Sequence, residues 1–271
     1  MDQAAGAPEG RDAAGDAAGL RDRYVARLGL EVAGRGRDLA LLRELQVAHL
    51  IAVPFENLDV FHRRGPRTGV DWSVPKVVDR RRGGWCFELN GAFGWLLRQL
   101  GFAVDYVSCR VFQDGAWGPP FDHCSLVVHL DGRRWLVDVG FGDACMVPVA
   151  LEPGEREGVP RPVGVEVDGE AFRTAEHHAD GGWRPALWGR FDPVELDAFT
   201  ARSDHLQTAP GLAWTKQPFA TRATAVDGSR VILRPGVLRV REGSGRFVDT
   251  PIDEDDWARL LAEHVGLEDG A

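Results

Sequence analysis

The sequence predicts an α+β fold in which helices and strands occupy separate stretches of the chain. Through the first hundred residues, apolar side chains recur at helical spacing. After Phe102 the period changes to two, because Val104, Tyr106 and Ser108 alternate with the residues between them, as in strands. A final helix is expected from Asp253, where acidic residues precede an apolar stripe. Separate runs of helices and strands are typical of an α+β architecture.

Composition narrows the class of protein. The chain has 271 residues, a net charge of −9 and 44% apolar residues, enough for one large domain or two to three small subdomains. The acidic balance argues against a nucleic-acid partner. The sequence has no long uncharged apolar run and no apolar signal region near Met1, so we expect a cytoplasmic protein without a membrane partner. The four cysteines have no C-x-x-C spacing, which predicts reduced thiols, no disulfide framework and no metal site.

The N-terminal part is expected to be a tail followed by helices. Residues 1–19 are mainly Ala, Gly and Asp and predict a mobile tail. Asp38 is a suitable N-cap for the second helix, and we interpret His49 on its apolar stripe as a core or flanking residue rather than a ligand. The expected helices cover residues 20–28, 38–50 and 70–82.

The stretch from Arg81 to Asn90, RRGGWCFELN, combines two glycines, a cysteine and the start of a helical stripe. The glycines allow a tight turn and a close backbone approach. Leu89, Phe93 and Leu96 continue the stripe, so we expect Cys86 in the first turn of a helix. The positive end of the helix dipole favours a thiolate, which is the nucleophilic form of cysteine. On position alone, a small buried apolar cysteine is an equally good interpretation.

A hairpin is expected around Asp131-Gly132, a strong two-residue turn signal between two β-rich runs. With these residues as the loop, Ser125 lies opposite Asp138. His123 then shares a face with Asp138 and lies diagonally from it, about 7–8 Å away at the backbone. An aspartate inside an apolar strand needs a partner, whereas a histidine at a strand edge is often only a polar surface residue. The turn chemistry therefore predicts an imidazole beside a carboxylate.

The rest of the chain is expected to contain more strands. Residues 148–169 are rich in Gly, Pro and Glu and predict an excursion between strands. Strands are expected near Val165, near Phe172 and over residues 183–191, with three or four more over residues 219–250.

A cysteine at a helix start, a histidine and an aspartate beside that histidine are the parts of a thiol nucleophile system. The imidazole takes the thiol proton, and the carboxylate fixes the tautomer and stabilises the imidazolium. Backbone N–H groups near Cys86 would bind an oxyanion. This chain order occurs in several acyl-transfer families, so the three residues predict acyl chemistry without specifying the acceptor.

The motifs around these residues resemble those of the arylamine N-acetyltransferases. Residues 82–90 (RGGWCFELN) are similar to the active-site motif of that family, residues 54–58 (PFENL) to its upstream motif, and residues 135–142 (WLVDVGFG) to its aspartate motif. The spacing of Cys86, His123 and Asp138 agrees with the family pattern. The similarity runs from about Tyr24 to Gly266, nearly the whole chain.

The resemblance implies a helical bundle, a central antiparallel β-barrel and a C-terminal α/β lid, with the triad arranged as in cysteine proteases. We accordingly expect a helical domain over residues 20–102 that carries the nucleophile, a β-barrel domain over residues 103–205 that carries the histidine and aspartate, and a lid over residues 206–271. The resemblance also implies a ping-pong reaction. Cys86 would accept an acyl group from acetyl-CoA or another acyl-CoA, a co-substrate rather than a bound cofactor, and pass it to an aromatic amine or hydrazine.

Further roles follow from motif position within the family. Phe55 and Phe141 would line the acceptor pocket, and Gly142 would allow close approach. Arg82 and Glu56 would form a supporting ion pair, because a buried charge requires compensation.

The chain departs from the family at the residues beside the histidine. Many members have a threonine or a similar residue before the histidine and an apolar residue after it, where this chain has Asp122 and Cys124. Strand alternation predicts that Asp122 points away from His123 into solvent.

Other functions stay open at this point. Related amide synthases of the ansamycin type use the same triad to release a polyketide chain from an acyl carrier protein as a macrolactam. A thiol hydrolase of the transglutaminase or protease type shares the triad geometry. A scaffold that only binds ligands would be expected to have lost Cys86, His123 or Asp138. The sequence indicates no oligomeric state.

Overall fold

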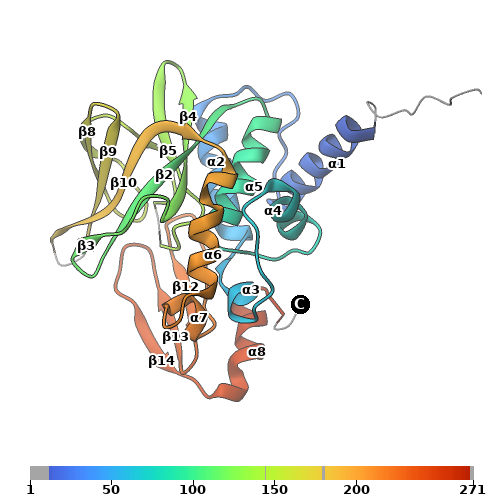
Figure 1. The fold of residues 1–271 in the computed structure, drawn as a ribbon, viewed down its shortest axis with the longest axis vertical. Coiled ribbons are helices and arrows are strands. Elements are labelled where there is room, and N and C mark those ends of the chain that lie inside the picture. Colours follow the sequence, from blue (N-terminus) through green and yellow to red (C-terminus); the bar gives the residue numbers. More distant parts are fainter. Residues whose placement is uncertain (1–11, 144, 179–180, 269–271) are drawn as a thin grey trace, which may run out of the picture.

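The computed structural model describes residues 12–143, 145–178 and 181–268. Its helices and strands form a helical part, a nine-stranded antiparallel sheet and a smaller five-stranded sheet. Figure 1 shows helices α1, α2, α4 and α5 beside the large sheet and the smaller sheet below it. The large sheet curves into a nearly closed barrel, so the α+β architecture predicted from the sequence is confirmed.

Sequence signals mark most boundaries of the N-terminal helices. Helix α2 begins after Asp38, whose side chain accepts a hydrogen bond from the backbone N–H of Leu41, as an N-cap does. Helix α4 ends earlier than the predicted residue 82, and Arg81 adopts a positive φ of 51°. The helices are α1 (Asp12–Arg27), α2 (Leu39–Ala52), α3 (Leu58–Phe61), α4 (Val70–Val78) and α5 (Cys86–Gln99).

Helix α1 corrects the expected N-terminal tail. The sequence predicts a mobile tail over residues 1–19, but the helix already begins at Asp12. Its later turns carry Tyr24 and Val25, which are buried in the core and hold that end of the helix in place. Alanine has the highest helix propensity, so the alanine-rich turns before them can extend the packed helix. Residues 1–11 lie outside the described part of the chain.

The large sheet contains the predicted hairpin in the predicted register. Leu130 pairs with Arg133 and Leu126 pairs with Val137. Asp131 and Gly132 have φ values of 52° and 73°, as a type I′ turn requires. The strand order is β6-β5-β4-β2-β10-β9-β8-β7, with β3 paired to β2. The strands are β2 (Ala103–Gln113), β3 (Ala116–Trp117), β4 (His123–Leu130), β5 (Arg133–Val137), β6 (Val149–Ala150), β7 (Gly154–Arg156), β8 (Val163–Asp168), β9 (Ala171–His177) and β10 (Trp183–Val194).

Half of the segment expected as an excursion between strands, residues 148–169, belongs to the sheet, and this half includes β8, the strand expected near Val165. It contains β6, β7 and β8, and β8 pairs with β9 along its whole length. The glycines and prolines of this segment therefore indicate its turns, and they do not exclude strands between the turns.

The smaller sheet joins the C-terminal part of the chain to the N-terminal part. Its order is β1-β11-β12-β13-β14, and Phe55 of β1 pairs with Thr221 of β11. Four strands over residues 219–251 agree with the sequence prediction. The elements are β1 (Phe55–Glu56), β11 (Ala220–Ala223), β12 (Arg230–Arg234), β13 (Val237–Arg241) and β14 (Val248–Pro251). The accompanying helical segments are η1 (Leu196–Phe199), α6 (Thr200–Thr208), α7 (Ala213–Lys216), η2 (Glu254–Asp256), α8 (Trp257–Leu260) and a π-helical turn (Leu261–Val265).

Strand β4 lies between two apolar cores, one on each of its faces. Leu126 and Val128 belong to the apolar core against the helices, whereas Val127 belongs to the core inside the barrel. Both faces of the strand are therefore buried, which fixes its register strongly. None of the helices in the described part of the chain has the length and apolar character needed to cross a membrane.

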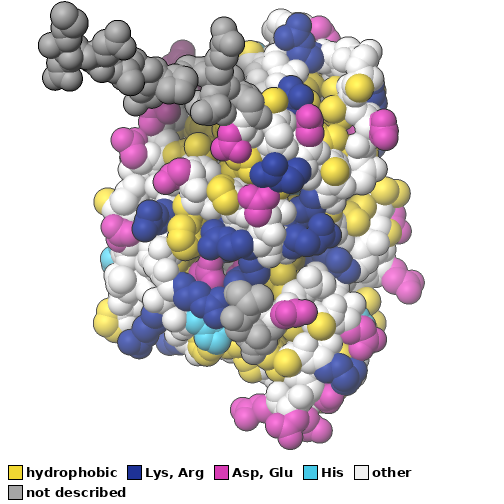
Figure 2. Space-filling view, turned by 90° about the vertical axis from the view of Figure 1, so that its right-hand side faces the viewer, with side chains coloured by type: hydrophobic (Ala, Val, Ile, Leu, Met, Phe, Trp, Pro, Cys, Tyr) yellow, Lys and Arg dark blue, Asp and Glu magenta, His cyan; other side chains and the backbone are white. Residues whose placement is uncertain are grey.

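The charged side chains are distributed unevenly over the surface. Figure 2 shows the side that carries α1 and α4, where arginine side chains gather across the middle and acidic side chains gather at the lower end. The acidic residues around the last helix include Asp253, Glu254 and Asp255. The net charge of −9 is therefore not spread evenly.

Candidate active site

Cys86 is the first residue of α5, as predicted, and it is 8% exposed. The turn before it depends on close packing. A Cβ atom at Gly83 would lie 2.1 Å from the carbonyl oxygen of Pro54, and one at Gly84 would lie 2.5 Å from a carboxylate oxygen of Glu88. The two glycines therefore serve close approach, while the positive φ of the turn is at Arg81.

His123 and Asp138 lie side by side at the open end of the β4–β5 hairpin. The Nε2 atom of His123 is 2.6 Å from Oδ2 of Asp138, and both side chains are buried. The predicted register brings the two residues to one face of the hairpin, as the sequence indicated. The other ring nitrogen, Nδ1, does not bind Asp138, and Cys86 lies near enough to raise the pKa of the imidazole.

The charge of the imidazole is set by its carboxylate neighbour. Burial lowers the pKa of His123, but Asp138 and the neighbouring Cys86 outweigh burial and raise it to about 10. The imidazole is therefore protonated at neutral pH, and it faces a sulfur atom at the positive end of a helix.

Three donors besides His123 surround the Asp138 carboxylate. Ser125 Oγ donates to Oδ2 at 2.5 Å, and Asn90 Nδ2 and the backbone N–H of Gly140 donate to Oδ1, each at 2.9 Å. Burial raises the pKa of Asp138, but His123 and these donors outweigh it and keep the pKa below its usual value. The carboxylate is thus held ionised and in one orientation.

Sequence reasoning missed the roles of Asn90 and Ser125. Asn90 also accepts from the backbone N–H of Val139 and donates to the carbonyl of Cys124, so one amide joins α5 to β4 and to the segment that follows β5. The available signal was its spacing of one helical turn from Cys86 on a buried face. Ser125 was placed opposite Asp138 by the register, but no role was assigned to it.

The other cysteines differ from Cys86 in their surroundings. Burial raises the pKa of Cys109, Cys124 and Cys145. A raised pKa keeps these thiols protonated and unreactive. In the described residues, moreover, no group of three or more His, Cys, Asp or Glu side chains is arranged to hold a metal ion.

The residues expected to line the acceptor pocket lie close to the triad. The Phe141 ring is 5.2 Å from that of His123, in an edge-to-face arrangement. Gly142 has a φ of 77°, and a Cβ atom there would be 3.9 Å from the Phe55 ring. Phe55 in turn packs edge-to-face against Trp214, at 5.8 Å, and Phe219, at 5.9 Å. The last two aromatic rings come from the C-terminal part and were not predicted.

The ion pair expected between Arg82 and Glu56 is present and belongs to a larger buried network. Nη2 of Arg82 lies 2.9 Å from Oε1 of Glu56 and 3.3 Å from Oδ1 of Asp59. Lys76 Nζ bridges Asp59 at 2.7 Å and Glu88 at 2.8 Å. Glu88 accepts the backbone N–H of Trp85, the N-cap of α5, at 3.2 Å. The network therefore fixes the helix start that carries the cysteine.

Asp122 points away from His123, as strand alternation predicted, but it does not simply face solvent. Its Oδ1 accepts from Nη2 of Arg202 at 2.6 Å and from Nε at 3.0 Å, and its side chain is 17% exposed. Arg202 belongs to α6, so the departure from the family motif ties the barrel to that helix.

Comparisons with known proteins agree with this geometry. A family model for N-acetyltransferases matches residues 38–269. The arylamine N-acetyltransferase of Mycolicibacterium smegmatis is 35% identical over 248 residues, covering 83% of this chain and 84% of that protein. A crystal structure of a variant arylamine N-acetyltransferase from Mycobacterium smegmatis matches with a TM-score of 0.82 and 30% identity, covering 91% of this chain and 92% of that one.

A second solved structure bears on the co-substrate. The Mycobacterium marinum arylamine N-acetyltransferase in complex with CoA matches with a TM-score of 0.80 and 25% identity, covering 90% of this chain and 92% of that one. Family match, sequence relatives and fold all point to one family. The chain belongs to the arylamine N-acetyltransferase family and is an acyltransferase.

Proposed function

We propose that this protein moves an acetyl group from acetyl-CoA, through a thioester on Cys86, to the nitrogen of an aromatic amine or hydrazine. The observation that carries the proposal is the buried hydrogen bond between His123 and Asp138, with Cys86 at the start of α5 near enough to raise the pKa of the imidazole. The solved relative in complex with CoA supports CoA as the carrier of the acyl group.

In the first half-reaction, the Cys86 thiolate attacks the carbonyl carbon of the acetyl thioester. Backbone N–H groups at a helix start lack acceptors one turn earlier, and those of Cys86 and Phe87, the first residues of α5, are suited to stabilise the oxyanion. The bond between the carbonyl carbon and the CoA sulfur breaks. The CoA thiolate leaves with the proton of the His123 imidazolium, so the imidazole is neutral in the acetyl-enzyme.

In the second half-reaction, the amine nitrogen attacks the acetyl carbon on Cys86. The neutral imidazole of His123 takes the proton that the amine loses. The carbon–sulfur bond to Cys86 breaks and the thiolate–imidazolium pair is restored. Asp138 holds the ring in one tautomer through both steps and stabilises its positive charge.

Phe55, Phe141 and Gly142 form the acceptor pocket in this proposal. The aromatic rings offer flat apolar surfaces for an aromatic amine, and Gly142 leaves room beside Phe55 because it has no side chain. In this proposal the ion pair between Arg82 and Glu56 supports the start of α5, and neither residue contacts the substrate. The relatives reported above are named arylamine N-acetyltransferases, which favours acetyl-CoA over a carrier protein as the donor.

Intact-protein mass spectrometry after mixing with acetyl-CoA tests the proposal. We expect one added acetyl group that is lost when aniline is added. The Cys86→Ala variant should gain none, whereas Cys145→Ala, which removes the least buried of the other cysteines, should behave like wild type. An adduct from a long-chain acyl carrier-protein thioester but not from acetyl-CoA would indicate an amide synthase. No adduct from either thioester would overturn the acyl-enzyme mechanism.

A further inference from the structure

A second cluster of charged side chains surrounds Asp143, directly after the residues that form the acceptor pocket. Its arginine side chains are at most 10% exposed, and the Asp143 side chain is 30% exposed. Arg241 binds its carboxylate through both terminal nitrogens, with Nη2 at 2.7 Å from Oδ1 and Nη1 against Oδ2. Arg230 Nε lies 3.2 Å from Oδ1, and Arg161 Nη2 lies 3.3 Å from Oδ2. Three arginines therefore converge on one carboxylate, and Glu176 is the second acid, 2.7 Å from Arg161.

The arginines come from different parts of the fold. Arg230 begins β12 and Arg241 ends β13, and the two are paired directly across these strands of the smaller sheet. Arg161 precedes β8 of the barrel. Asp143 itself follows the Asp138–Gly142 segment. The cluster thus connects the C-terminal sheet, the barrel and the loop beside the catalytic carboxylate.

Arg230 and Arg241 are like charges in a buried place, and the Asp143 carboxylate compensates them. Like charges directly opposite each other in a sheet repel, and both Arg230 and Arg241 are only 2% exposed, so solvent cannot screen them. Burial lowers the pKa of Arg230 to about 10, which still leaves it charged at neutral pH. The pair is compensated by the Asp143 carboxylate, whose pKa is lowered by the arginines despite burial.

The loop held by this cluster carries the pocket residues. Phe141 contacts the imidazole of His123, and Gly142 faces Phe55. The bidentate bond to Arg241 limits both the position and the rotation of the Asp143 side chain. A shift of the C-terminal sheet would therefore be transmitted to Phe141 through two residues of backbone.

We infer that Asp143 is a positioning residue that fixes the Phe141–Gly142 loop to the C-terminal sheet and thereby determines which acceptor amines fit the pocket. This inference rests on the proposed function, because it concerns the step in which the amine attacks the acetyl-enzyme. Asp143 touches neither the triad nor the amine in this role. It acts by holding Phe141.

The test separates acetylation from acceptor choice. The Asp143→Asn variant is acetylated with acetyl-CoA, and the rate of loss of the acetyl group is measured by mass spectrometry with aniline and with the bulkier 1-aminonaphthalene. A freed loop should slow transfer to aniline but admit the two-ring amine, so the ratio of the two rate constants (two-ring over one-ring) should rise about 10-fold. Normalising to the acetylated fraction removes any loss of folded protein from this ratio.

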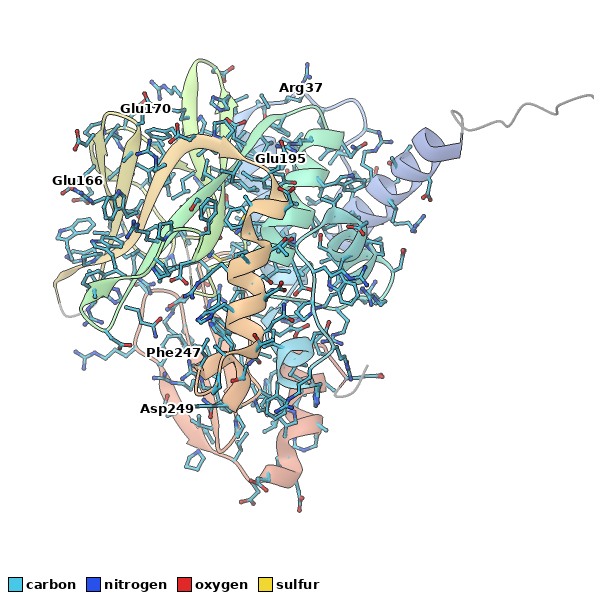
Figure 3. The ribbon with its side chains drawn as sticks, viewed as in Figure 1. Arg37, Glu166, Glu170, Glu195, Phe247 and Asp249 are labelled. Carbon is cyan, nitrogen blue, oxygen red and sulfur yellow. The ribbon has the colours of Figure 1, made fainter. Side chains whose placement is uncertain are left out.

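Asp249→Asn is the matched control. Asp249 pairs with Arg239 on the same sheet at 2.7 Å, but its side chain is 53% exposed. Figure 3 labels it just below Phe247, on the lower left side of the molecule. This variant removes the same charge from an exposed ion pair and should leave the ratio unchanged.

A conservative variant covers the case in which Asp143→Asn does not fold. Arg241→Lys keeps the charge but loses the bidentate bond, and should shift the ratio in the same direction by a smaller factor. A ratio within about twofold of wild type in the folded variants would overturn the positioning role, even if thermal stability falls. Failure of wild type itself to become acetylated would overturn the proposed function and the pocket role together.

Discussion

Two buried histidines of this protein are held in opposite charge states. His49 on α2 and His123 on β4 are 0% and 3% exposed, and each has an aromatic ring nearby. Burial lowers the pKa of His49 to about 3, helped by the charge of Arg27, and its Nε2 atom pairs with the Tyr24 hydroxyl at 2.8 Å. His123 faces a carboxylate instead, and its pKa is raised to about 10.

The difference teaches that the partner, and not the burial, decides what a buried histidine can do. A neutral hydroxyl cannot compensate a buried positive charge, so His49 stays neutral and serves packing. An ionised carboxylate with three further donors can compensate it, so His123 stays protonated. The interpretation of His49 as a core residue agrees with its contacts.

The largest expected effect comes from breaking the His123 partnership. Asp138→Asn keeps the shape of the side chain but removes its charge and misorients the imidazole, so we expect kcat/KM for acetyl transfer to fall by about 10⁴-fold, as in serine triads. Asp122→Asn makes the same change at a neighbouring aspartate that binds Arg202, and should stay close to wild type. Near wild-type turnover in Asp138→Asn would remove Asp138 from the mechanism.

The pH dependence of unfolding should separate the two histidines. Below about pH 6.5, His49 binds a proton in the unfolded chain but not in the native protein. Native stability is therefore lost as pH falls from about 6.5 towards 3. Native His123 holds a proton that the unfolded chain releases, so its contribution is complete below about pH 6.5 and is lost as pH rises towards 10. Each slope is at most about 1.4 kcal/mol per pH unit.

Chemical denaturation of wild type, His49→Gln and His123→Gln at several pH values measures these contributions. The His49 variant should lose the slope on the acidic side only, and the His123 variant the slope on the alkaline side only. Equal slopes in both variants across the whole range would show that the two histidines do not differ in charge.

The rate at which Cys86 is alkylated depends on the charge of its neighbour His123. Stoichiometric iodoacetamide at neutral pH should label Cys86 at least about 100-fold faster than the other cysteines, since their burial raises the thiol pKa. His123→Gln should slow this labelling, and His49→Gln should not, as peptide mapping will measure. Labelling of Cys109, Cys124 or Cys145 ahead of Cys86 contradicts the assignment of the nucleophile.

The smallest expected effect comes from the partner of His49. Tyr24→Phe removes the hydroxyl bonded to Nε2 and leaves a buried ring nitrogen unpaired, so we expect a loss of about 1–2 kcal/mol in the free energy of unfolding. Turnover at a temperature where the variant is folded should equal that of wild type. A loss of activity larger than the unfolded fraction accounts for would show that His49 affects the active site. That result would contradict the difference in role between His49 and His123.

The hairpin is where local sequence information was most complete. A two-residue turn that requires positive φ at Asp131 and Gly132 leaves one register for the flanking strands, and that register alone brings His123 and Asp138 to one face. The helix starts at Asp38 and Cys86 could be predicted equally well, because N-caps, glycines and the spacing of apolar residues act over a few residues. Composition was a poorer guide, as the helix from Asp12 and strands β6 and β7 within residues 148–169 show.

The sequence by itself determined the separation of helices from strands, the register of the hairpin and the place of Cys86 at a helix start, because each depends on interactions between near neighbours. Only the tertiary structure decided which distant groups meet: Asn90 at the Asp138 carboxylate, Lys76 between Asp59 and Glu88, and Arg241 on Asp143. These contacts join segments whose approach depends on the packing of whole layers, and buried charge then selects the partner that compensates it.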